Sequence, residues 1–166
     1  MKKELKVCNT KSNLWLLESI DDPFVQEVIS MWKEHNRNGI LCWIPVESDK
    51  EPKWDVASFV LLEQDRDWTI RGTWTHPDYR KQGLSSFILQ HIIGELELFN
   101  PFGWLWVNIT TGAESVYEKA GFKIYVQRTD TDEPISVGVY SRYDKDREIQ
   151  RFVEKFPCHE LFEEKD

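Results

Sequence analysis

The chain has 166 residues, of which 40% are hydrophobic and 30% are charged, and its formal net charge is −8. This length fits one globular domain with a substantial hydrophobic core, and the composition argues against an intrinsically disordered chain. No apolar stretch approaches the roughly 20 residues of a membrane helix, and the acidic balance disfavours tight nucleic-acid binding. We therefore expect a single domain over residues 1–166, without a membrane or nucleic-acid partner.

The N-terminal segment and the cysteines indicate a reducing compartment. The basic residues near the start are not followed by an apolar segment, so no signal peptide is predicted. Cys8, Cys42 and Cys158 are odd in number and widely spaced, which is typical of free thiols. The pair Cys158-His159 has no second pair to complete a metal site. The sequence therefore predicts a cytoplasmic protein without a metal.

The first half of the chain predicts a helix followed by an antiparallel meander. Residues 14–17 predict a short strand. Asp22 and Pro23 are typical of a helix start, apolar residues then recur at helical spacing, and Gly39 is expected to end the helix. Three strands with short polar turns between them are predicted over residues 40–46, 54–63 and 68–76.

From residue 84 the period of the apolar residues changes from that of a strand to that of a helix. Leu84, Ile88 and Ile92 lie on one face of this helix, which Pro101 ends. The remaining elements are a buried strand over 104–109, a helix over 113–120, strands near 122–128 and 135–140, and an amphipathic helix over 144–155. The strand–helix–strand path makes two strands parallel, so we expect an α/β fold with a mixed sheet and helices on its faces.

The segment THPDYRKQGLSS, residues 75–86, joins a predicted strand to this helix. The first N–H groups of a helix have no partner, and with the helix dipole they favour an anion by roughly 0.3–1 kcal/mol. Gly83 and the small residues Ser85 and Ser86 leave the backbone accessible to a phosphate, while Arg80 and Lys81 add positive charge. The spacing matches neither the Walker motif nor the dinucleotide motif. The segment is thus either a phosphate-binding loop or a solvated basic turn.

The motif RKQGLS at residues 80–85 resembles the R/Q-x-x-G-x-G/A loop of the GNAT superfamily of N-acetyltransferases, and the preceding HPDYR resembles its lead-in. AESVYEKAGF at 113–122 resembles a second motif of the family, and the two together cover about residues 68–126. Two positions depart from the family pattern: Ser85 replaces Gly or Ala, and Thr110 replaces Asn. The resemblance implies a mixed, mostly antiparallel sheet of about six or seven strands, flanked by helices and splayed between the fourth and fifth strands.

The same resemblance implies an activity. A primary amine, on a small molecule or a protein, would attack the thioester of acetyl-CoA directly, with no metal. Tyr117 stands where family members commonly have the general acid that protonates the departing thiolate; the alternative is that its ring only packs. The resemblance implies that acetyl-CoA contacts Thr73, Thr75, Arg80, Lys81, Gln82, Gly83, Leu84, Ser85, Ser86 and Thr110.

The general base is not identified by the sequence. The place where some family members have Glu is Thr69 here. Other candidates are Glu63, Asp65 and Asp67, which are more typical of a solvated turn, and His76, for which a surface role is preferred. His91 is expected in the core.

The acceptor is indicated only by charge. Asp130, Asp132 and Glu133 form an acidic turn that would concentrate cationic amines, or that is simply solvated. Two alternatives to the enzyme remain open: a catalytically silent acyl-CoA-binding module of the same fold, and a divergent member that modifies nucleic acid. A homodimer is compatible with the sequence.

Overall fold

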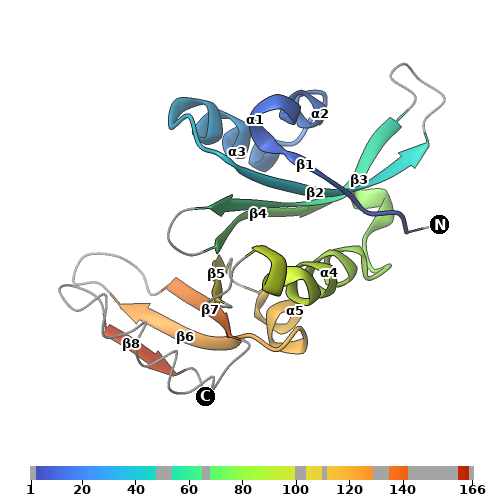
Figure 1. Ribbon diagram of the computed structural model, residues 1–166. Coiled ribbons are helices and arrows are strands. Elements are labelled where there is room, and N and C mark those ends of the chain that lie inside the picture. Colours follow the sequence, from blue (N-terminus) through green and yellow to red (C-terminus); the bar gives the residue numbers. More distant parts are fainter. Residues whose placement is uncertain are drawn as a thin grey trace. The chain divides into compact units, whose positions relative to one another are not determined.

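The computed structural model describes residues 3–47, 54–64, 68–99, 104–109, 112–128, 135–141 and 161–164 (Figure 1). The chain divides into two compact units. The first comprises Met1–Arg66 and Ile70–Ile92, and the second comprises Asp67–Thr69 and Ile93–Asp166. None of the described helices combines the length and the apolarity needed to cross a bilayer.

The first unit is built on strands in the order β1-β2-β3-β4. Their bounds are Lys6–Asn9, Gly39–Glu47, Trp54–Gln64 and Trp68–Thr75. The pairs β1–β2 and β2–β3 are antiparallel, and β4 is the next strand beside β3. The three strands predicted over residues 40–46, 54–63 and 68–76 are therefore confirmed. β1 at the edge was not predicted, because its four residues show no alternation of apolar and polar side chains.

The prediction of a strand over residues 14–17 is wrong, because Leu14 is the turn residue between two short helices and residues 15–17 belong to the second of them. These helices are α1 (Thr10–Asn13) and α2 (Trp15–Glu18), and the side chain of Asn9 caps α1 by accepting the Lys11 N–H. Leu14 and Leu17 are buried while Trp15 is exposed. Residues three apart share one face of a helix, but a four-residue apolar run does not reveal that period.

Helix α3 (Pro23–Glu34) covers the sheet of the first unit together with α1 and α2 (Figure 1). Asp22 caps it by accepting the Val25 N–H over 3.1 Å, as its sequence predicts. The core between α3 and the strands contains Val25, Val28, Ile29, Trp32, Leu41, Phe59, Leu61 and Trp74. The helix ends before Gly39, which instead begins β2. A Cβ atom on Gly39 would lie only 1.9 Å from the Leu62 carbonyl oxygen, so the strand pairing requires glycine there.

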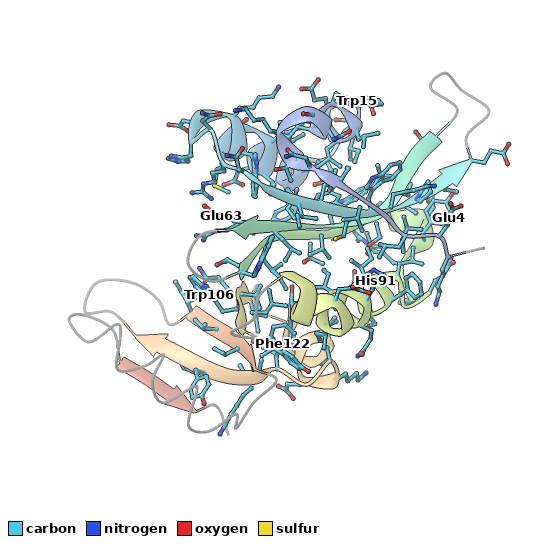
Figure 2. The ribbon with its side chains drawn as sticks, in the orientation of Figure 1. Glu4, Trp15, Glu63, His91, Trp106 and Phe122 are labelled. Carbon is cyan, nitrogen blue, oxygen red and sulfur yellow. The ribbon has the colours of Figure 1, made fainter. Side chains whose placement is uncertain are left out.

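After β4 a short 3-10 helix, η1 (Pro77–Tyr79), leads into α4 (Leu84–Phe99), which begins in the first unit and ends in the second. Its buried side chains include Leu84, Ile88, Leu89 and Ile92. His91 is exposed, so its expected place in the core is wrong; Figure 2 labels it on α4.

The second unit contains strands in the order β5-β7-β6-β8, and neighbouring strands are antiparallel. Their bounds, in chain order, are Trp104–Ile109, Lys123–Arg128, Ile135–Ser141 and Leu161–Glu164, and helix α5 (Glu114–Lys119) precedes β6. The strands expected near 104–109, 122–128 and 135–140 and the helix within 113–120 are confirmed. β8 was not predicted, and the described residues contain eight strands rather than six or seven. The helix expected over 144–155 lies outside the described residues.

Candidate active site

The loop between β4 and α4 has an unusual backbone. Lys81 has a φ of +64° and Gly83 a φ of +72°. The left-handed region costs a residue with a side chain about 1–2 kcal/mol, and glycine adopts it freely. Conformations of this kind in non-glycine residues persist where the surrounding structure holds them, and they cluster at ligand-binding sites. The strain at Lys81 therefore marks this loop as a candidate site.

Gly83 is the residue from which α4 starts. Its carbonyl accepts the Phe87 N–H over 2.9 Å, which is the first hydrogen bond of the helix. The N–H groups of Leu84, Ser85 and Ser86 have no acceptor in the described part of the chain. Gly83 has no side chain to cap them, so these three N–H groups point a partial positive charge out of the helix.

A chain of three hydroxyl groups fixes the first turn of α4 to the sheet. The buried Ser58 hydroxyl donates to the Trp74 carbonyl over 2.9 Å, the Thr75 hydroxyl lies 2.9 Å from that of Ser58, and the Ser85 hydroxyl lies 2.8 Å from that of Thr75. Each hydroxyl has one proton. Because Ser58 gives its proton to a carbonyl, Thr75 donates to Ser58 and Ser85 donates to Thr75. The side chain of Ser85 thus anchors the loop and has no proton left for a phosphate.

The basic side chains of the loop remain at the surface. Arg80 and Lys81 are exposed, as are Gln82 and Ser86. The Arg80 Nε donates to the Thr75 carbonyl over 3.2 Å, which holds the guanidinium group at the end of β4. Leu84 is buried, so only its backbone faces outward. The loop therefore combines free N–H donors with two exposed cations.

The two threonines at the end of β4 flank Trp74 and lie on the opposite face of the strand from it. Thr73 and Thr75 are both half-buried. Thr75 uses its hydroxyl and its carbonyl within the loop. Trp74, between them, packs into the core under α3, and side chains alternate across a strand. The loop and the first turn of α4 therefore lie on the opposite face of β4 from α3.

Tyr117 lies in the second unit, on α5. Its side chain is buried, and its ring packs edge-on against Phe122 with 5.4 Å between ring centres. The carboxylate of Glu114 accepts the Gly112 N–H over 2.9 Å and the Ser136 hydroxyl over 3.3 Å, so it ties the start of α5 to β7. The ring of Tyr117 is therefore held in a fixed place by packing.

The candidate bases fall in different environments. Glu63 belongs to β3 and forms ion pairs with Arg71 and Arg37, so the expectation of a solvated turn is wrong for it. Thr69 is buried in β4. The His76 Nδ1 accepts the Asp78 N–H over 3.1 Å and so caps η1, a local structural role that agrees with the surface role expected for it.

Several predicted site residues lie outside the described residues. These are the candidate bases Asp65 and Asp67, the cofactor-contact candidate Thr110, and the acidic turn of Asp130, Asp132 and Glu133. Their roles remain predictions.

A cavity of about 280 Å³ opens at the end of β4, within the first unit. Asp21, Asp22 and Asp55 line it together with Trp74 and His76. The Trp74 and His76 rings are 5.8 Å apart and nearly perpendicular. The cavity shares His76 and Pro77 with the connection that leads into the basic loop, so an acidic recess and a basic loop begin at the same strand end.

No group of three or more His, Cys, Asp or Glu residues suited to a metal ion occurs among the residues that the structure describes. Cys8 and Cys42 are free thiols, as the sequence predicts, whereas Cys158 is not described. Burial raises the pKa of both described thiols.

Residues 8–122 match the model of the acetyltransferase (GNAT) family. The chain belongs to this family. The match covers more than half of the chain and includes both motifs that the sequence singled out. Among curated protein sequences, none matches significantly.

Solved structures show the same fold. The ribosomal-protein-S18-alanine N-acetyltransferase from Escherichia coli is 18% identical, with a TM-score of 0.57 over 83% of this chain and 94% of that protein. A Bacillus subtilis acetyltransferase in complex with CoA is 16% identical, with a TM-score of 0.57 over 84% and 99% of the chains. The spermidine/spermine N-acetyltransferase from Vibrio cholerae is 10% identical, with a TM-score of 0.53 over 89% and 96%. The predicted GNAT-like fold is confirmed.

Membership in the family establishes the general activity, which is acetyl transfer from acetyl-CoA to an amine. The residues present fit this co-substrate, since the loop offers free N–H donors and exposed cations to its phosphates. Ser58 was missed by the sequence reasoning. Its only signal was a hydroxyl within an otherwise apolar strand.

Proposed function

We propose that the loop of residues 80–86 binds the diphosphate of acetyl-CoA. The observation that carries this proposal is the set of free N–H groups at Leu84, Ser85 and Ser86, next to a left-handed Lys81. Backbone N–H groups at a helix start bind phosphate without any side-chain motion. Arg80 and Lys81 supply charge, Gln82 supplies an amide, and Ser85 holds the turn in place. Isothermal titration with CoA tests the proposal, and a melting curve shows whether each variant is folded.

The remaining contacts proposed for acetyl-CoA are made along β4 and at Thr110. The backbone of Thr73 and Thr75 would pair with the amide groups of the pantetheine arm, and Thr110 would contact the same arm. Bound acetyl-CoA supplies the acetyl thioester that the amine attacks. The match to the family spans parts of both units, which supports one acetyltransferase domain over residues 1–166.

Tyr117 is proposed as the general acid of this reaction. Its hydroxyl would give a proton to the sulfur of the departing thiolate, a contribution worth roughly 10²- to 10⁴-fold in rate. The packing against Phe122 supports the assignment because it fixes the direction of the ring. Glu63 is not the base in this proposal, because its carboxylate is held by two guanidinium groups.

The acceptor is proposed to be a cationic primary amine. The acidic cavity at Asp21, Asp22 and Asp55 supports this, because clustered carboxylates raise the local concentration of cations. Two enzymes of similar fold have acceptors of different kinds. The Escherichia coli enzyme acts on a ribosomal protein, and the Vibrio cholerae enzyme acts on spermidine and spermine. A thiol-release assay with a panel of polyamines, peptides and nucleic acids distinguishes these classes. Release with nucleic acid alone would overturn the proposal.

We also propose that the enzyme acts in the cytoplasm. Free thiols at Cys8 and Cys42 support a cytoplasmic enzyme. Binding of CoA without turnover on any amine would instead favour a silent acyl-CoA-binding module.

A further inference from the structure

The ammonium group of Lys3 lies beside the start of α4. Its Nζ is 3.9 Å from the place that a Cβ atom would take on Gly83, and 5.7 Å from the centre of the Phe87 ring. Figure 1 draws the N-terminal segment and the start of α4 on the same side of the first unit. The segment before β1 thus brings a third cation to the loop of Arg80 and Lys81.

This is an unfavourable place for a cation without an anion. The N-terminus of a helix carries partial positive charge, and Arg80 and Lys81 add to it. Among the described residues, no carboxylate forms an ion pair with Lys3, and the adjacent Glu4 is paired with Lys6 at 2.7 Å. The face of the Phe87 ring offsets only part of the repulsion. An anion bound at the N–H groups of α4 would offset the rest.

We propose that Lys3 is a cofactor-binding residue whose ammonium group pairs with the diphosphate of acetyl-CoA. The proposal rests on the function proposed for the loop. Nζ lies 3.9 Å from the position that a Cβ atom would take on Gly83, so an anion bound at the N–H groups of the first turn would lie within its reach. The N-terminal segment then forms part of the cofactor site, although the family motifs lie far from it in sequence.

Isothermal titration of the full chain at low salt tests the proposal with three ligands. CoA has both the diphosphate and the 3′-phosphate, dephospho-CoA retains only the diphosphate, and S-acetylpantetheine has neither. In Lys3→Gln we expect the dissociation constant to rise by about three- to tenfold for CoA and dephospho-CoA, and to be unchanged for S-acetylpantetheine. The difference should shrink with added salt, because exposed charges are screened beyond about 10 Å at 0.1 M.

Two further variants complete the experiment. Lys3→Arg retains the charge and should bind CoA within about twofold of the parent. Lys11→Gln removes an exposed lysine of α1, away from Glu4 in sequence, and its affinity should not change. Melting curves show that each variant is folded.

Three results would overturn the proposal while the loop assignment stands. They are unchanged CoA affinity in Lys3→Gln, a loss confined to CoA and absent with dephospho-CoA, and an equal loss with S-acetylpantetheine. A parent protein that does not bind CoA would overturn the loop assignment itself, and this result is distinct from the other three.

Discussion

The carboxylate of Glu63 lies between the guanidinium groups of Arg71 and Arg37, and both arginines contact the same oxygen, Oε2. All three side chains are mostly buried. In Figure 2, Glu63 lies at the opposite end of the first unit from Glu4, and therefore from the segment that carries Lys3. Glu63 thus joins β3 to β4 as a structural ion pair, away from the loop.

Replacing Glu63 with Gln should lower stability and leave the chemistry intact. The loss of a charged hydrogen-bond acceptor beside two arginines should reduce the free energy of unfolding by about 1 kcal/mol, measured by urea denaturation. The pH dependence of turnover should keep its shape. Glu47→Gln, at an exposed position on β2, is the matched control and should change neither. A loss of turnover above about 100-fold with normal stability would instead identify Glu63 as the base.

Replacing Gly83 with Val should abolish detectable CoA binding, or weaken it at least about tenfold. A β-branched residue is strained at a φ of +72°, and its side chain covers the N–H groups of the first turn. Titration calorimetry measures the affinity. Gly94→Ala is the control in the same helix, where a Cβ meets no atom within 4 Å; it should raise stability by about 0.5–1 kcal/mol without changing affinity. Parental affinity in folded Gly83→Val would rule out the loop as the phosphate site.

Replacing Tyr117 with Phe separates the proton donor from the packed ring. The variant keeps the contact with Phe122, so the melting temperature and the affinity for acetyl-CoA should hardly change. The catalytic rate should fall by roughly 10²-fold or more if the hydroxyl is the general acid. Near-parental turnover, under conditions where chemistry limits the rate, would show that Tyr117 serves only to pack.

Two acidic regions compete as the acceptor site, and variants can tell them apart. Changing Asp21 and Asp55 to Asn removes two of the three acidic side chains of the cavity at the end of β4; Asp22 is left intact because it caps α3. We expect this double variant to raise the KM for a cationic amine several-fold at low salt, with little change at high salt.

The comparison variant neutralises Asp130, Asp132 and Glu133. A larger rise in KM there than in the cavity variant would place the acceptor at the acidic turn. If neither variant raises KM, the acceptor is not recognised through its positive charge. The affinity for acetyl-CoA should stay constant throughout and serves as the control.

Burial raises the pKa of the Cys42 thiol to about 12, and the nearby Cys8 adds to the shift. An unfolded cysteine ionises near pH 8.5, so between about pH 9 and 12 the unfolded chain releases a proton that the folded chain retains. Stability should therefore fall as the pH rises through this window. Urea denaturation at pH 8 and pH 10 should show a smaller fall for Cys42→Ala than for the parent. An equal loss of stability in the two proteins would mean that the Cys42 thiol ionises as easily in the folded state as in the unfolded state.

The sequence predicted those features that depend on local spacing. The start of α4 was predictable because the apolar period changes at Leu84 and because Gly83 precedes it. Helix α2 was not, since the four apolar residues 14–17 fit either period. The hydroxyl chain depends on the contacts of Ser58 in β3 with Trp74 and Thr75 in β4. The place of Lys3 beside Gly83 depends on contacts between segments that are far apart in sequence. The ion pairs of Glu63 also join separate segments, which is why a turn was expected instead.

The hydroxyl chain from Ser58 to Ser85 has a consequence for the cost of binding. Its three protons point in one direction, so the Ser85 side chain is already immobilised before any ligand arrives. A phosphate at the loop would be met first by peptide groups, which have no rotamers to lose. The conformational entropy lost on binding would then come mainly from the long side chains of the surrounding cations. Immobilising each of these side chains costs about 0.5–1.5 kcal/mol. If the loop binds a phosphate as proposed, the chain of hydroxyls preorganises it for that anion.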